Sequence, residues 1–179
     1  MRLATRVMIC IDGSNIKWGL DNYNNQWSTK VRIDYQKLIT TLVAGRQLVR
    51  SIYYCSVPVP PSDPDQIKFH EYLRSLNIQI VPKELKSRYD SKIGAPRSYE
   101  KGVDVALATD LLAMAWENAY DVAILVSGDA DYIGAVSKVM SKGKNVELVG
   151  FKGRIASDLR KNVIKTTQLD DIMDQIKRI

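Results

Sequence analysis

Three separate segments of this chain carry aspartates where a hydrolytic metal site would need them. Asp12 ends the apolar segment RVMICID, and Asp129 and Asp131 follow the apolar segment DVAILVS one residue apart. Asp104 lies in KGVDVALATDLL, at the start of a third apolar segment. Oxygen ligands without nearby Cys or His suit hard cations such as Mg²⁺ or Mn²⁺. The chemistry that these residue types indicate is metal-assisted hydrolysis.

Each aspartate also has a purely structural interpretation. An Asp between a strand and a helix often caps the helix, and Asp131 is the member of the set that a capping role suits best. Four carboxylates that converged without a cation would repel and raise one another's pKa values. We therefore expect Asp12, Asp104, Asp129 and Asp131 to bind Mg²⁺ or Mn²⁺, with Asn15 and Ser127 beside them.

Other catalytic chemistries find little support in the composition. The chain has one histidine, His70, so a Ser-His-Asp or Cys-His triad is hard to assemble. Cys10 and Cys55 lie within apolar runs and are expected to be buried, reduced thiols. His70 is expected on the surface of a helix or half-buried there.

Strand-like and helix-like segments alternate along the chain. Buried strands are expected at residues 6–12, 48–58, 78–82, 121–127 and 145–151, and residues 164–179 should form a short edge strand and a terminal helix. Helices are expected at residues 33–45, 64–77, 103–119, 130–143 and 156–163. This order predicts an α/β fold with a mostly parallel sheet of about five strands. Such sheets place function beyond the carboxyl ends of their strands.

Several local features of these elements can be predicted. Residues 14–23 should form a short helix or turn that leads into a polar loop at residues 24–26. The helix at residues 103–119 is apolar almost all round and should be central and buried, so Asp110 within it needs a partner. That partner could be a hydrogen bond or a lysine, or Asp110 could support the metal ligands from behind. The tryptophans are expected in the core or at its rim, with Trp18 near enough to Asn15 to line a cleft; they are Trp18, Trp27 and Trp116.

Residues 83–101 are polar and non-periodic, with six basic residues and three acidic ones. Gly94 and Pro96 indicate a loop, and Tyr89 and Tyr99 are interleaved with the charges. Such a segment could bind RNA through its cations and stack its tyrosines on unpaired bases, or it could be a solvated surface loop. The candidate RNA-binding residues are Lys101, Arg97, Lys92, Arg88 and Lys86.

Length and charge bound the remaining possibilities. The chain has 179 residues, which fits a single domain at 1–179, and its net charge of +6 is a weak pointer to nucleic acid. No apolar run approaches the roughly 20 residues of a membrane helix, and the N-terminus lacks a signal peptide's apolar core. A cytoplasmic protein with no membrane partner is expected.

The segments IDGSN, KGVDVALATDLL and LVSGDADY, in this order, resemble the NYN domain family, and within it the LabA-like (DUF88) branch. GKNVELVGF and ASDLRKNV extend the resemblance to nearly the whole chain. NYN domains are relatives of PIN-domain nucleases. The resemblance implies a compact three-layer α/β/α PIN-like (Rossmannoid) fold and a metal-dependent ribonuclease. It carries the acidic set over to Asp12, Asp104, Asp129 and Asp131, with Asn15 and Ser127 as polar supports.

The expected reaction is phosphodiester hydrolysis in RNA by metal-bound hydroxide, which needs no histidine base. Asp12, Asp129 and Asp131 would hold one ion, and Asp104 would contribute to it or to a second. Asn15 would orient a ligand or the scissile phosphate, and Ser127 would bond a carboxylate or the phosphate. The resemblance suggests 5′-phosphate and 3′-hydroxyl products.

Two other functions fit parts of the pattern. A non-catalytic RNA-binding or regulatory NYN domain would keep the fold and bind RNA without cleaving it. A haloacid dehalogenase-type phosphatase also has acidic residues after its first strand, but it requires Asp-x-Asp there, and this chain has Asp12-Gly13-Ser14-Asn15. RNA is the expected partner, no small-molecule cofactor is expected, and the sequence leaves the oligomeric state open.

Overall fold

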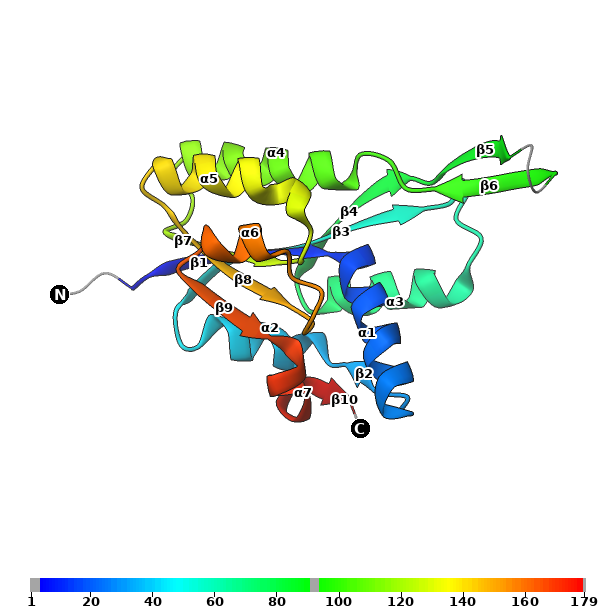
Figure 1. Ribbon diagram of the computed structural model, residues 1–179, viewed down its shortest axis with the longest axis horizontal. Coiled ribbons are helices and arrows are strands. Elements are labelled where there is room, and N and C mark those ends of the chain that lie inside the picture. The colour runs from blue at the N-terminus through cyan, green and yellow to red at the C-terminus, as the bar shows by residue number, and fades with distance from the viewer. Residues whose placement is uncertain (1–3, 91–93, 179) are drawn as a thin grey trace.

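A six-stranded, entirely parallel sheet forms the centre of the molecule, in the order β4-β3-β1-β7-β8-β9 (Figure 1). The computed structural model describes residues 4–90 and 94–178. The strands of this sheet are β1 (Arg6–Asp12), β3 (Gln47–Val57), β4 (Ile78–Glu84), β7 (Val122–Val126), β8 (Asn145–Gly150) and β9 (Lys165–Gln168). The predicted parallel α/β sheet is confirmed, and the edge strand expected near the C-terminus is its sixth strand.

Helices cover both faces of the sheet, which gives three layers (Figure 1). One face carries α1 (Gly13–Trp27), α2 (Tyr35–Val43), α3 (Pro64–Ser75) and α7 (Leu169–Ile176), and the other carries α4 (Val103–Trp116), α5 (Ile133–Ser141) and α6 (Ser157–Lys161). Alternate side chains of β1 enter the two cores: Val7, Ile9 and Ile11 pack on one side and Met8 and Cys10 on the other. None of the helices in the described part of the chain could span a membrane.

The connections place a topological switch point between β1 and β7. From β1 the chain runs outward through β3 to β4, then returns to β7 on the other side of β1 and continues to β8 and β9. Ile11 is in register with Val126, so Asp12 and Ser127 leave the sheet side by side. In open α/β sheets, ligands bind in the crevice at this position.

Residues 83–101 are not the loop that the sequence predicts. They include β5 (Lys86–Asp90) and β6 (Ala95–Tyr99), which pair in an antiparallel hairpin that projects from the body (Figure 1). A hairpin with no face in the core needs no apolar alternation, so the pattern that identifies a half-buried strand is missing. A second small sheet joins β2 (Arg32–Ile33) to β10 (Lys177–Arg178).

The first helix is also longer than predicted and includes residues 24–26. Asp12 caps its start, and Ser28 ends it in a left-handed conformation. The polar residue Asn24 is predicted in a loop, but it lies in the last turn of α1. Its side chain there binds the segment that follows the helix. Its Oδ1 accepts hydrogen bonds from Thr29 Oγ1 and from the backbone N–H of Val31, each at 2.9 Å.

The prediction that α4 is buried all round is wrong. Val103, Leu107, Leu111 and Ala115 form one buried face, whereas Val105 on the opposite face is 63% exposed. Val105 and Ala113 on the outer side of the helix count as apolar in a sequence pattern but are exposed to water.

The three tryptophans are exposed rather than in the core, but Trp18 lines a cavity together with Asn15, as predicted. Other local predictions are confirmed: Asp110 accepts a hydrogen bond from Tyr54 Oη at 3.0 Å, and both cysteines are buried free thiols. His70 lies on α3 as expected but is buried, 3.5 Å from Cys55 Sγ.

Candidate active site

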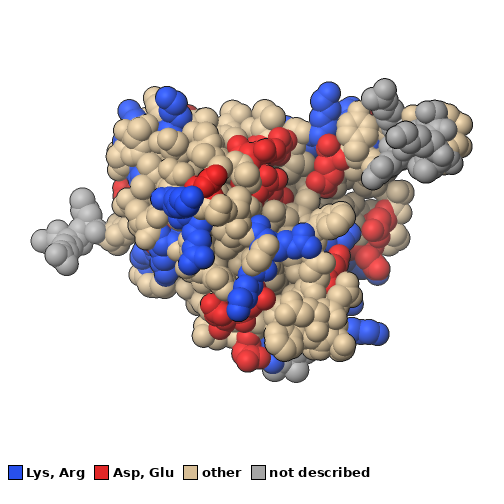
Figure 2. All heavy atoms as spheres, in the orientation of Figure 1, with Lys and Arg blue, Asp and Glu red and all other residues tan. Residues whose placement is uncertain are grey.

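A cleft of about 370 Å³ lies at the carboxyl ends of β1 and β7, where the sheet topology reverses. All four predicted carboxylates line this acidic cleft. The lining residues are Asp12, Ser14, Asn15, Trp18, Glu100, Lys101, Gly102, Val103, Asp104, Asp129, Asp131, Tyr132 and Arg154. Figure 2 shows acidic side chains gathered near the starts of α4, α5 and α1, with basic side chains on either side.

Asp12 is the fixed member of the acidic set. It is buried at the end of β1, and its Oδ1 accepts the backbone N–H of Asn15 at 3.1 Å while capping α1. Its Oδ2 accepts hydrogen bonds from Ser127 Oγ and Tyr132 Oη, both at 3.1 Å. Burial raises the pKa of Asp12, although these hydrogen bonds oppose the shift. A carboxylate held this firmly can orient a ligand with little loss of side-chain freedom.

Asp129 and Asp131 follow a sharp exit from β7 that only glycine permits. A Cβ atom on Gly128 would lie 2.0 Å from the backbone oxygen of Arg154. Asp129 caps the short 3₁₀ helix η1 (Ala130–Tyr132), and its Oδ1 accepts the Asp131 N–H at 3.0 Å. The capping residue is therefore Asp129, and the capping role considered for Asp131 is wrong. Both side chains are exposed at the cleft.

Asp104 reaches the cleft from α4. It lies in the first turn, after Gly102, whose φ of 81° is left-handed, and no side chain caps this helix. The buried Tyr132 lines the same cleft and donates from Oη to Asp12 Oδ2 at 3.1 Å. Burial is the main cause that raises the pKa of Tyr132, and the charges of Asp12, Asp129 and Asp104 raise it further. Carboxylates from three separate segments therefore line one cleft.

The donor set of the cleft fits a hard divalent cation. It consists of carboxylate oxygens, and no ion pair in the described part of the chain involves the four predicted aspartates. As placed, no three Asp, Glu, His or Cys side chains among residues 4–90 and 94–178 form a group that could hold a metal ion. Coordination would require rotation of exposed side chains toward Asp12, and Asp104, Asp129 and Asp131 are all exposed.

Asn15 and Ser127 act mainly through their neighbours. Asn15 Oδ1 accepts the Gly128 N–H at 3.1 Å, so the loops after β1 and β7 are joined directly. Ser127 is buried, donates to Asp12 and accepts the Asp129 N–H at 3.2 Å. Of the two roles expected for Ser127, the bond to a carboxylate is the one that the structure contains.

Among the cleft residues that the sequence did not predict, Tyr132, Glu100 and Arg154 carry polar or charged groups into the cleft. Tyr132 is the last residue of the segment LVSGDADY, but an aromatic residue at a helix start resembles ordinary packing. Glu100 directly precedes the motif at Asp104, accepts a hydrogen bond from Ser14 Oγ, and its charge helps to raise the pKa of Asp12. No local signal identifies Arg154, which comes from the segment after β8.

The predicted RNA-binding residues are only partly brought to the cleft. Lys101 lines it, whereas Lys86 lies on the hairpin and pairs with Glu84. Arg88 and Arg97 are opposite each other in the hairpin register. Lys92 lies outside the described residues. Tyr89 and Tyr99 are 66% and 44% exposed, as stacking side chains would need to be.

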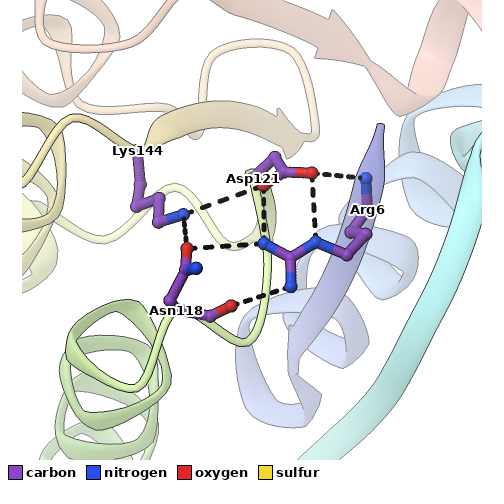
Figure 3. A network of polar contacts seen from close by, with 4 residues as sticks. All are labelled: Arg6, Asn118, Asp121 and Lys144. Atoms are coloured by element: carbon purple, nitrogen blue, oxygen red, sulfur yellow. Dashed lines mark hydrogen bonds and ion pairs between the residues drawn. The ribbon is translucent and has the colours of Figure 1, made fainter. Parts of the chain in front are cut away.

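The same two strands are joined by a different network at their amino ends (Figure 3). Arg6 Nη2 lies 2.8 Å from Asp121 Oδ1, and the Arg6 N–H donates to Asp121 Oδ2 at 2.9 Å. Lys144 Nζ lies 3.7 Å from the same carboxylate and also contacts Asn118. Chiefly through the Arg6 hydrogen bonds, the pKa of Asp121 falls to about 2. Asp121 is therefore paired with two cationic side chains, whereas the four aspartates of the cleft form no ion pair among the described residues.

Comparison with known proteins agrees with the geometry. Residues 6–170 match the model of the NYN domain family. The chain is 27% identical over 177 residues to the low amplitude and bright protein LabA of Synechococcus elongatus, covering 97% of this chain and 89% of that protein. A crystal structure of a Vibrio parahaemolyticus protein of unknown function superposes with a TM-score of 0.77, at 21% identity over 99% of this chain and 100% of that one.

The chain therefore belongs to the NYN domain family, whose members are typically ribonucleases. The solved structure has the same α/β fold, so the predicted architecture and the predicted family are both confirmed.

Proposed function

We propose that this protein is a metal-dependent ribonuclease that hydrolyses RNA phosphodiester bonds in the acidic cleft. The observation that carries the proposal is that Asp12, Asp104, Asp129 and Asp131 line one cleft at the switch point of a parallel sheet. Perturbed ionisable groups that meet in a cleft are characteristic of catalytic sites. Membership of a family of typical ribonucleases supports the same reaction.

Mg²⁺ or Mn²⁺ would be held by Asp12, Asp129 and Asp131, with Asp104 completing that site or contributing to a second. When bound, such an ion lowers the pKa of a coordinated water and offsets charge that develops on the phosphate. Asp12 needs no reorganisation because three hydrogen bonds already fix it. Ser127 and Tyr132 are therefore positioning residues that act through Asp12.

The remaining polar groups of the cleft suit the substrate. Since Gly128 N–H donates to Asn15 Oδ1, the amide nitrogen of Asn15 is left as a donor for a phosphate oxygen. Lys101 and Arg154 also line the cleft and supply positive charge for the phosphodiester. The cleft contains no histidine, so activation of water depends on the carboxylates and the ion that they hold.

The experiment is a cleavage assay on purified protein with tRNA, rRNA, mRNA and short single-stranded RNA. Each RNA is incubated with Mg²⁺, with Mn²⁺ and with a chelator. We expect RNA cleavage that requires the metal. The Asp129→Asn variant should lose this cleavage and should bind RNA as tightly as the wild type does. Asp158→Asn is the matched control, because Asp158 is an exposed carboxylate on α6 that pairs with Lys161.

Two other outcomes would replace this proposal. RNA binding without cleavage under any metal condition would indicate a non-catalytic RNA-binding or regulatory domain. Hydrolysis of a phosphomonoester without RNA cleavage would indicate the phosphatase. The phosphatase lacks structural support, because Ser14 stands where the second aspartate of Asp-x-Asp would be and donates a hydrogen bond to Glu100.

A further inference from the structure

A second cavity of about 890 Å³ adjoins the acidic cleft on the face that α1 and α3 cover. Ser14 and Glu100 line both cavities, and the hydrogen bond between them marks the boundary. We call this cavity the α1–α3 groove; its walls include Ile16, Lys17 and Leu20 of α1 and Gln66, Lys68 and Phe69 of α3. Its size is typical of small-ligand sites, which span roughly 300–1,000 Å³.

The inner wall of the groove is aromatic. Tyr35, Tyr53 and Phe69 pack edge to face, with ring centroids 5.5 to 5.9 Å apart. Phe69 and Tyr72 are half-buried at the groove, and the Arg178 guanidinium lies over the Tyr72 ring, 5.7 Å from its centroid. The buried His70 also lines the groove, and burial lowers its pKa, which favours the neutral imidazole. Aromatic surface beside a neutral hydrogen-bonding group suits a flat, uncharged ligand such as a nucleobase.

The rim of the groove differs in charge from the cleft. The cleft has five carboxylates and two cations, which are Asp12, Glu100, Asp104, Asp129 and Asp131 against Lys101 and Arg154. The groove has four cations, which are Lys17, Arg32, Lys68 and Arg178, against Asp63, Asp65 and Glu100. The backbone of an RNA strand that leaves the acidic cleft would therefore meet phosphate-binding side chains here.

We propose that the α1–α3 groove is a nucleotide subsite that holds an unpaired base next to the scissile phosphate, with Lys17 and Lys68 contacting neighbouring backbone phosphates. This inference rests on the proposed function, because it assigns the path of the RNA that the cleft would cleave. It makes unpaired RNA the preferred substrate, since a base held in a duplex could not enter the groove.

The phosphate contacts are tested by binding of fluorescent single-stranded RNA in chelator, where no cleavage occurs. The variant is Lys17→Glu/Lys68→Glu, and the control is Lys138→Glu/Lys165→Glu, two exposed lysines that line neither cavity. We expect the groove variant to bind at least about tenfold more weakly, with the salt slope of log K reduced by roughly 2. The control should lose less affinity, and thermal melting should show both variants folded.

The base contact is tested with RNAs that carry one abasic position, moved along the strand. At one abasic position, the wild type should bind the RNA about tenfold more weakly than it binds the RNA with all bases present. Tyr72→Leu should remove that difference, whereas Trp116→Leu, an exposed aromatic residue outside both cavities, should keep it. Mononucleotides form a further arm: groove-dependent binding of AMP or UMP, with RNA binding independent of the groove, would overturn the RNA subsite.

Failure of this inference differs from failure of the proposed function. Metal-dependent cleavage with equal RNA affinity in the groove variant and its control would overturn the subsite and leave the nuclease in place. Groove-dependent RNA binding without cleavage would support the subsite and refute the nuclease.

Discussion

Polar side chains join β1 and β7 at both ends, and the aspartate at each end has the opposite electrostatic environment. At the amino end, Arg6 and Lys144 surround Asp121, whose pKa falls to about 2. At the carboxyl end, Asp12 is buried beside other carboxylates, and its pKa rises. One pair of strands thus has a compensated end that suits stability and an uncompensated end that suits ligand binding.

The largest expected effect is that of Asp12→Asn on cleavage. Changing even an outer-shell partner of a metal ligand typically costs about 10- to 100-fold, so loss of the ligand itself should reduce cleavage at least about 100-fold. The variant should remain folded, because the amide keeps an acceptor oxygen for the Asn15 N–H and removes the charge that burial disfavours. Cleavage kinetics and chemical denaturation in chelator measure the two effects. Intact cleavage or a marked loss of stability would contradict this view of the carboxyl end.

Tyr132→Phe is expected to have an intermediate effect. It removes one of the two hydroxyl donors to Asp12 Oδ2 but keeps the ring in the core. The cleavage rate should fall about tenfold, which is the lower end of the range expected when a residue that supports a metal ligand is removed. The optimal metal concentration should rise, which a purely structural role would not produce. A metal titration of activity distinguishes the two roles.

The sheet could be predicted from sequence because its central strands are buried on both faces and appear as continuous apolar runs, such as residues 122–126. The acidic set could be predicted because the carboxyl ends of parallel strands meet. The hairpin could not be predicted, since neither of its faces enters the core. Glu100 and Arg154 could not be predicted, because tertiary packing brings them to the cleft from segments that carry no motif. The exposure of the outer face of α4 could not be predicted either, because it depends on the tertiary arrangement of the other elements.

The smallest expected effect is that of Asp121→Asn at the amino end. The Arg6 and Asp121 side chains are 33% and 41% exposed, so solvent screens the pair, and its loss should cost about 1 kcal/mol. Cleavage should be unchanged. A large loss of activity with intact folding would show that the two ends are not separate in function.

The Asp121 contribution should depend on pH in a defined direction. The pKa of the folded state is lowered from about 4 to about 2, so the stabilisation is present above pH 4 and is lost as pH falls toward 2. The difference in unfolding free energy between the wild type and Asp121→Asn should therefore shrink over that range. Denaturation curves at several pH values would show it, and a difference that grew on acidification would refute the assignment.

The most direct test of the account is calorimetric titration of Mn²⁺ into the wild type, Asp12→Asn and Asp121→Asn. If the carboxyl end is the cation site, the wild type and Asp121→Asn should bind Mn²⁺ equally, and Asp12→Asn should bind at least about tenfold more weakly. Equal binding by all three proteins, or no binding by the wild type, would contradict the assignment of the acidic cleft as the metal site.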